Sequence, residues 1–341
     1  MNRIVSRSVV LCAVLLLGAC AQQDSGVEVV NMAGTATPGT PGEAMWLNFK
    51  RDAEAAAGGQ LKLRALIHGQ LGSEEKLLSG LRRGRIQFAN LSAQVVSTLV
   101  PELSVLYAPY LFESTDEADF VYDHYLTDRF RELLAEHGLY LVTWYEIGFH
   151  SIYAREPLIV PADAAGRRFR VSSALSSRLF AEALHADVIP LGFGDIVPSL
   201  QTGLIDAGEN SVSLYARTGI AAEAPHYTLT RHLFGVSVIV ASKRWWDALD
   251  PKLRKIMADT FPSVDESRAA SRAQELRDLN DPALGIQVHE LSEAQRELWK
   301  AAVKDVTPEL IQRLGGHSAE ILDLIQQGKR AWTEQKRPAR D

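Results

Sequence analysis

The segment from Gly166 to Leu214 contains the polar side chains best suited to ligand chemistry. Arg170 lies in a predicted strand, 168–171, at the end that continues into two serines. Open α/β sheets bind ligands at the carboxyl ends of their strands, and a guanidinium fits a carboxylate in a bidentate manner. Arg170 is therefore a candidate carboxylate ligand, the alternative being a solvated edge residue or a structural ion pair. Arg168 shares its pleat direction and suits that structural role better.

Two more residues of this segment are candidates for the same cavity. Asn210 ends a Gly-Glu-Asn turn that follows a predicted strand, 204–207, and opens a helix. Its amide could bind a ligand oxygen, or it could simply cap the helix. Phe193 stands between a glycine and the next helix, where it could form the floor of a cavity or belong to the core.

Enzymatic motifs are incomplete throughout the sequence. His289–Glu290 lacks the second histidine of a zinc helix, and the glycines in 192–194 lack the third glycine of a dinucleotide loop. The carboxylate pairs Glu74–Glu75 and Asp116–Glu117 fall at helix starts, where the helix dipole favours negative charge, so we expect them to be solvated or capping residues and not general acids or bases. The sequence predicts no catalytic residue, no cofactor, no metal site and therefore no enzyme.

The composition is that of a globular protein with a substantial core. Of 341 residues, 46% are hydrophobic and 23% are charged, and the formal net charge is -6. Charges of both signs are scattered along the chain, so nothing indicates a nucleic-acid partner.

The amino terminus resembles a bacterial lipoprotein signal. A basic start precedes a short apolar stretch, 9–17, and the run Leu-Gly-Ala-Cys ends at Cys20. We expect residues 1–19 to be a signal peptide, Cys20 to be lipidated, and residues 20–26 to be a tether to the membrane. The alternative is an ordinary secretory signal that happens to end in cysteine. Ala21 leaves open which membrane holds the anchor.

Short apolar segments alternate with amphipathic ones after this leader, which is typical of an α/β fold. We predict one α/β domain over 27–150, a second over 151–240, and a mainly helical segment, 241–341, that packs across both. A strand over 232–241 is expected to connect or serve both domains. Within the first domain we expect a long helix, 116–137, and a strand, 139–144.

Several motifs in order resemble one transport family. Gly-Arg-Arg-Phe-Arg-Val at 166–171, and the run from Val188 to Asn210, are similar to the substrate-binding proteins of tripartite ATP-independent periplasmic (TRAP) transporters, the DctP type. Residues 69–72, 81–89, 106–112 and 245–249 also resemble segments of this family. The resemblance implies a periplasmic-binding-protein-like fold whose two domains close on a small organic acid. It also implies delivery of that acid to a permease with small and large membrane subunits.

The resemblance assigns ligand-binding roles to individual residues. Arg170 falls on the arginine that binds the carboxylate, Asn210 on the asparagine of Glu-Asn, and Phe193 on an aromatic that lines the pocket. Asn90 and Ser92 fall on a strand exit of the first domain that supplies polar contacts.

The chain also departs from the family pattern. His150 stands where a second arginine is often found, and a histidine is only partly charged near neutral pH. This substitution weakens the expectation of a dicarboxylate or sialic-acid-like ligand and leaves room for a less acidic or more apolar one. The lipid anchor suits either a tethered receptor for a permease in the periplasm or a lipoprotein used for ligand sensing or assembly without a permease.

Overall fold

The computed structural model describes residues 26–336. The predicted signal peptide, 1–19, the predicted lipidation site Cys20, most of the tether and the last five residues lie outside this range. Between residues 26 and 336, no helix is both long enough and apolar enough to cross a membrane.

The centre of the molecule is one mixed nine-stranded sheet in the order β2-β1-β3-β8-β4-β7-β5-β6, with β9 paired to β8. Pairing is parallel among β1, β2 and β3 and among β5, β6 and β7, whereas β8 and β4 run antiparallel to their neighbours on this path. The strands are β1 (Glu28–Ala33), β2 (Leu61–Leu66), β3 (Phe88–Ser92), β4 (Leu139–Ala154), β5 (Arg168–Val171), β6 (Asp187–Pro190), β7 (Ala207–Ser211), β8 (His226–Ser242) and β9 (Gln287–His289).

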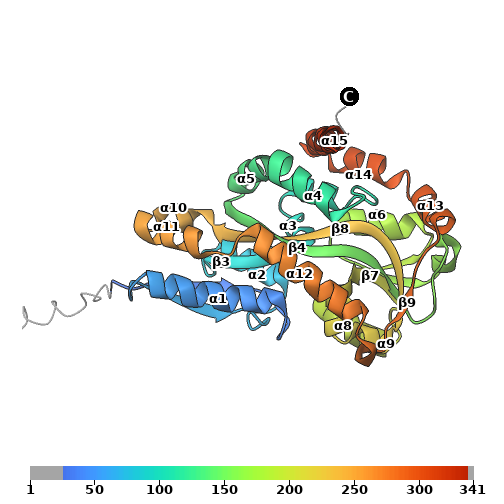
Figure 1. The fold of residues 1–341 in the computed structure, drawn as a ribbon, viewed down its shortest axis with the longest axis horizontal. Helices are drawn as coiled ribbons and strands as arrows, with labels where there is room; N and C mark the ends of the chain where they lie inside the picture. Colours follow the sequence, from blue (N-terminus) through green and yellow to red (C-terminus); the bar gives the residue numbers. More distant parts are fainter. Residues whose placement is uncertain (1–25, 337–341) are drawn as a thin grey trace, which may run out of the picture.

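Two long strands join the halves of the molecule. β4 and β8 pair from Leu139–Ser242 to Ala154–His226, with register shifts that interrupt the ladder at three places. One end of β8 pairs with β3, and the far end of β4 pairs with β7. Figure 1 shows both strands curving through the centre between two groups of shorter strands. The strand predicted to serve both domains is therefore β8, and the predicted boundaries after residues 150 and 240 fall inside these two strands.

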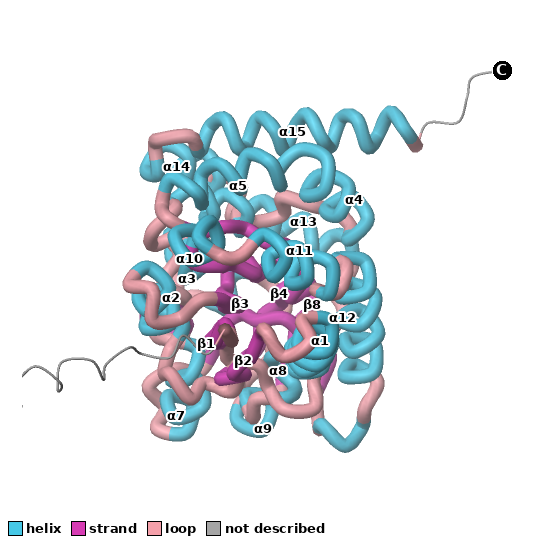
Figure 2. Tube along the Cα trace, turned by 90° about the vertical axis from the view of Figure 1, so that its left-hand side faces the viewer, coloured by secondary structure: helices cyan, strands magenta, loops and turns pink. Residues whose placement is uncertain are grey.

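Helices cover the sheet on both sides (Figures 1 and 2). Up to residue 223 they are α1 (Pro41–Ala56), α2 (Glu74–Arg82), α3 (Ala93–Val96), α4 (Thr115–Val121), α5 (Thr127–Glu136), α6 (Leu175–Ala183), α7 (Ile196–Gln201), α8 (Val212–Arg217) and α9 (Ile220–Glu223). The later helices are α10 (Lys243–Ala248), α11 (Pro251–Thr260), α12 (Val264–Leu279), α13 (Glu293–Ala302), α14 (Val306–Leu314) and α15 (Ser318–Gln335).

Local sequence explains why the first helix forms and where it packs. The Thr40 hydroxyl caps its amino terminus, and Pro41 fits the first turn, where no backbone N–H is needed. Trp46 and Phe49 point from its buried face onto Phe88 of β3, with ring centroids 5.5 and 5.6 Å away. Burial of these aromatic rings attaches α1 to the sheet.

The predicted helix over 116–137 is interrupted by a π-helical turn, Tyr122–Leu126, between α4 and α5. The Thr127 hydroxyl donates to the carbonyl of Tyr122 at 2.7 Å, which supports the wider turn. Helix α15 packs against this turn and α4 at the top of Figure 2, where Gly328 allows close approach to Val121 and Tyr125.

Several predicted boundaries were wrong. The strand predicted over 139–144 continues to residue 154, because the bulge around Gly148 hides its alternating pattern. The strand predicted over 204–207 begins only at Ala207 and runs to Ser211.

Candidate functional site

A cavity of about 480 Å³ lies between the two groups of strands. Its walls include polar residues from α2, β3, α3, β4, β5, β7 and α12. All six residues predicted to bind ligand line it: Arg170, Asn210, Phe193, His150, Asn90 and Ser92. The fold therefore gathers side chains from widely separated parts of the sequence at one site.

Arg170 is buried in this wall, with 5% of its surface exposed. Its Nε and Nη2 atoms donate to the carbonyl of Leu191 at 3.1 and 2.9 Å, which fixes the plane of the guanidinium. The group forms no ion pair with any residue from 26 to 336, and the edge bearing Nη1 stays available for a second acceptor. Arg168, in contrast, is exposed and pairs with Asp206 at 3.0 Å, which is the structural role expected for it.

His150 is held by the carboxylate of Glu209, which is not among the residues predicted from the sequence. Its Nδ1 hydrogen bonds with Glu209 Oε2, and both side chains are buried. Burial opposes ionisation of Glu209, but His150, His232 and Arg170 outweigh it and lower the pKa of Glu209 to about 2. The other ring nitrogen of His150 faces Gly235, where any side chain would collide with it. Although His150 borders the cavity, its ring is therefore fixed by Glu209 and β8.

Asn210 lies inside strand β7 and not in a turn, which corrects the prediction. Its Oδ1 accepts from the N–H of Ser211 at 3.0 Å, and its carbonyl accepts from the Tyr227 hydroxyl at 2.7 Å. The Gly208 that suggested a turn is a strand residue because the Tyr153 ring occupies the space of its side chain.

Asn90 and Ser92 lie at the exit of β3, as predicted, on the opposite wall from Arg170. Ser92 donates to Glu74 through both its N–H, at 2.8 Å, and its hydroxyl, at 2.7 Å. This pairing brings Glu74 to the cavity, although its position at the start of α2 had suggested only a capping role. Phe193 is half-buried beside the cavity and also packs against a neighbouring apolar cluster.

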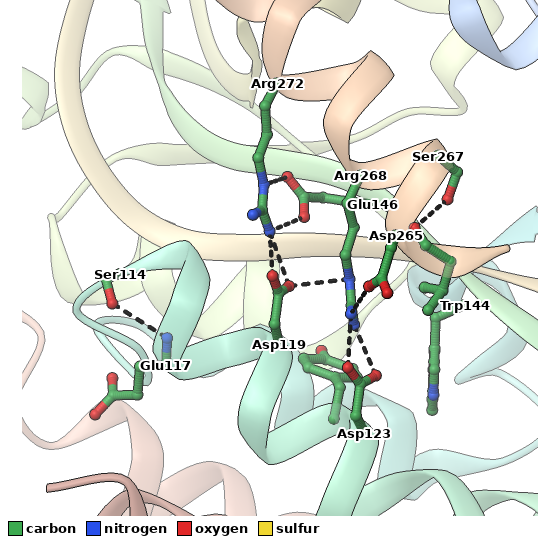
Figure 3. Close-up of polar contacts among 12 residues, drawn as sticks. Ser114, Glu117, Asp119, Asp123, Trp144, Glu146, Asp265, Ser267, Arg268 and Arg272 are labelled. Carbon is green, nitrogen blue, oxygen red and sulfur yellow. Dashed lines mark hydrogen bonds and ion pairs between the residues drawn. The ribbon is translucent and has the colours of Figure 1, made fainter. Parts of the chain in front are cut away.

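Glu146 also borders the cavity, but its charge is matched elsewhere. Figure 3 shows Arg272 between Glu146 and Asp119, with its Nη2 2.6 and 2.7 Å from their carboxylates. One turn earlier on α12, Arg268 contacts Asp119 and Asp123 at 3.0 and 2.7 Å. This ion-pair network attaches α12 to α4 and β4. Arg272 therefore has a structural role beside the site and is not available to bind a ligand.

At the other end of α12, Asp278 is buried and pairs with Arg217 of α8 at 2.6 Å. Helix α12 is thereby held to both halves of the molecule, as its path across the sheet in Figure 1 illustrates.

The chemistry available at this site is non-covalent binding of an anion. A buried guanidinium with a free edge faces a cavity large enough for a small organic molecule. Among residues 26–336, no group of three or more potential metal ligands is present.

Comparison with known proteins places the chain in a family. Residues 32–314 match the model of DctP, described as bacterial extracellular solute-binding protein, family 7. The C4-dicarboxylate-binding periplasmic protein DctP of Vibrio cholerae is 27% identical over 77% of this chain and 80% of the relative. The ectoine-binding periplasmic protein TeaA of Halomonas elongata is 25% identical over 75% of this chain and 77% of the relative.

Solved structures share the fold. The sugar acid binding protein DctPAm from Advenella mimigardefordensis, in complex with galactonate, aligns with a TM-score of 0.82 at 24% identity, over 89% of this chain and 99% of its own. A TRAP periplasmic solute binding protein from Roseobacter denitrificans with bound β-D-glucuronate aligns with a TM-score of 0.82 at 23% identity, over 88% and 99%. The family match, the two-domain fold and the cavity agree with the predicted architecture: the chain belongs to the DctP family of bacterial extracellular solute-binding proteins, the periplasmic binding proteins of TRAP transporters, and is not an enzyme.

Proposed function

We propose that this protein captures a small organic acid between its two domains, with Arg170 binding the carboxylate. The observation that carries the proposal is a buried guanidinium without an ion-pair partner among residues 26–336, at the wall of the cavity. An unpaired buried charge is costly, and a ligand carboxylate on the free edge of the guanidinium would compensate it. Relatives and neighbours named for C4-dicarboxylates, galactonate and glucuronate support the same ligand chemistry.

The remaining predicted residues take supporting roles in this proposal. Asn210 and Ser92 offer polar atoms from opposite walls, Asn90 adds an amide, and Phe193 provides an apolar surface. His150 shapes the wall through its bond to Glu209 and contributes no second carboxylate clamp. The domains predicted over 27–150 and 151–240, whose boundaries fall inside β4 and β8, would close around the ligand by a rotation in which these two strands twist.

The role of Arg170 can be tested with an internal control. Arg170→Ala should weaken binding of an organic acid by about 2–5 kcal/mol, because a charge-assisted contact is lost from a buried site. Arg168→Ala removes a guanidinium from the same strand but outside the cavity, and should leave affinity unchanged. Titration calorimetry measures both variants, using an acid found by a thermal-shift screen. Native affinity in a correctly folded Arg170→Ala protein would refute the proposed role.

We also propose that the protein is a lipoprotein, anchored through acylated Cys20, that delivers its ligand to a TRAP permease with small and large membrane subunits. The Leu-Gly-Ala-Cys run supports the anchor, and the family supports the permease. Cys20→Ser should move the protein from the membrane fraction to the soluble periplasmic fraction. Deletion of the gene should abolish uptake of the bound acid. Intact uptake in the deletion strain would favour ligand sensing or assembly without a permease.

A further inference from the structure

The cavity wall opposite Arg170 carries polar atoms of a different kind. Three residues of the first domain form it: Glu74 at the start of α2, Asn90 in β3 and Gln94 in α3. We call these three residues the distal wall. None of them is basic, so the distal wall differs from the arginine side in the ligand groups that it can bind.

Glu74 is a rigid hydrogen-bond acceptor in this wall. Its two carboxylate oxygens accept from the N–H and the hydroxyl of Ser92, and no lysine, arginine or histidine from the described range forms an ion pair with it. Each oxygen still has a lone pair for one further donor. Burial raises the pKa of Glu74, while Arg170 across the cavity acts in the opposite direction. A ligand O–H group would satisfy this acceptor without adding negative charge.

The side-chain amide of Gln94 is a hydrogen-bond donor without an acceptor in the described part of the chain. The residue is 7% exposed and lines the cavity, yet its Nε2 has no hydrogen-bond partner within residues 26–336. Asn90 has an unpaired acceptor instead: its buried Oδ1 receives no hydrogen bond from any residue between 26 and 336. Buried polar groups without partners are rare and costly, so an unpaired donor and an unpaired acceptor at one cavity indicate a ligand that supplies both. A hydroxyl group donates and accepts at the same time.

The charges around the cavity limit the ligand to one carboxylate. Arg170 is the only lysine or arginine among the described lining residues, whereas Glu74, Glu75, Glu146 and Asp195 are acidic. Glu146 is neutralised by Arg272. A second ligand carboxylate at the distal wall would meet Glu74 and no cation, and like charges in a partly dehydrated site repel strongly.

We propose that the preferred ligand is a hydroxylated monocarboxylate, such as a sugar acid, whose carboxylate binds Arg170 and whose hydroxyls bind Glu74, Asn90 and Gln94. This inference rests on the proposed function and adds the class of acid. It makes the distal wall the specificity determinant: unsubstituted monocarboxylates leave its polar atoms unpaired, and dicarboxylates bring a repelled charge.

The test compares five probes by titration calorimetry on the whole purified protein: D-galactonate, D-glucuronate, butanoate, succinate and ectoine. At least one of the two hydroxylated acids should bind more than about tenfold more tightly than butanoate and succinate, since a site built for hydroxyls strongly discriminates against analogues that lack them. Gln94→Leu should lose about tenfold to hundredfold affinity for that acid. Its thermal stability should be unchanged or higher, because the substitution removes an unpaired buried amide. Arg168→Ala is the matched control and should bind normally.

Glu74→Gln provides an independent test, because it should change the affinities for two ligands in opposite directions and misfolding would weaken both. Removing the negative charge should improve succinate binding while weakening the hydroxylated acid. Tighter binding of succinate or butanoate by the unmodified protein, in an Arg170-dependent manner, would overturn the inference and leave the proposed function intact. Preferential binding of ectoine would indicate that the distal wall binds a cationic group of the ligand. That result would also overturn the inference. Failure of all five probes would count against both the inference and the proposed function.

Discussion

Glu275 of α12 gives the sharpest prediction about the stability of this protein. Its Oε2 lies against Gly148, 3.0 Å from the position that a side-chain Cβ would take, at the bulge of β4. It forms no ion pair with any residue in the described range. Burial raises the pKa of Glu275 to about 7, Arg231 partly opposes this effect, and the nearby Glu146 adds to it.

The sign of the effect follows from proton linkage. Between its ordinary pKa of 4.5 and the folded value of about 7, the folded protein holds a proton on Glu275 that the unfolded chain releases. Stability from this group is complete below pH 4.5 and is lost as the pH rises through 7. At pH 8 the ionised side chain costs about 3 kcal/mol relative to its protonated form, and at pH 5 the cost is below about 1 kcal/mol.

Glu275→Gln imitates the protonated acid at every pH. Its free energy of unfolding should exceed that of the unmodified protein by about 3 kcal/mol at pH 8 and by less than about 1 kcal/mol at pH 5. Urea unfolding followed by tryptophan fluorescence at both pH values measures the difference. Glu290→Gln, at an exposed loop position, is the matched control and should change neither value. Equal effects of Glu275→Gln at pH 5 and pH 8 would refute the reasoning.

Two further predictions concern the buried groups around Glu209. Gly235→Ala should displace the His150 ring, because the added methyl group collides with its Nε2, and the variant should lose about 1–3 kcal/mol of stability in urea unfolding; an unchanged unfolding midpoint would show that the wall relaxes freely. Burial lowers the pKa of His232 to about 3, with Glu209 opposing, so the unfolded chain binds a proton below pH 6.5 that the folded protein does not. Stability should therefore fall between pH 6.5 and pH 3, and His232→Gln should reduce this slope in unfolding curves; an identical slope in the variant would contradict the assignment.

The sequence sufficed to predict the arginine side of the cavity. Arg170 lies in a short predicted strand that leads into the cavity as expected. Arg168, two residues earlier, shares its pleat direction, so its exposure comes from its position at the start of the strand and not from alternation. The α/β class was likewise predictable, because alternating apolar and amphipathic segments survive in the final fold.

Other parts of the site depend on contacts between distant segments. Gly208 and Gly235 are glycines because Tyr153 and His150 occupy their side-chain space, which local sequence cannot reveal. Glu74 reads as a capping residue at a helix start, and only its pairing with Ser92, 18 positions later, brings it to the cavity. The extent of β4 was missed because its register shifts break the period of two.

Helix α12 determines which movements of the two halves are possible. It has 16 residues and is about 24 Å long. It is tied at Arg268 and Arg272 to the first half of the chain and at Asp278 to α8. A rod fastened at both ends keeps its attachment points at a constant separation, so the halves cannot slide apart along it. We expect the two halves to pivot about this rod when the ligand enters, while β4 and β8 twist to permit the movement.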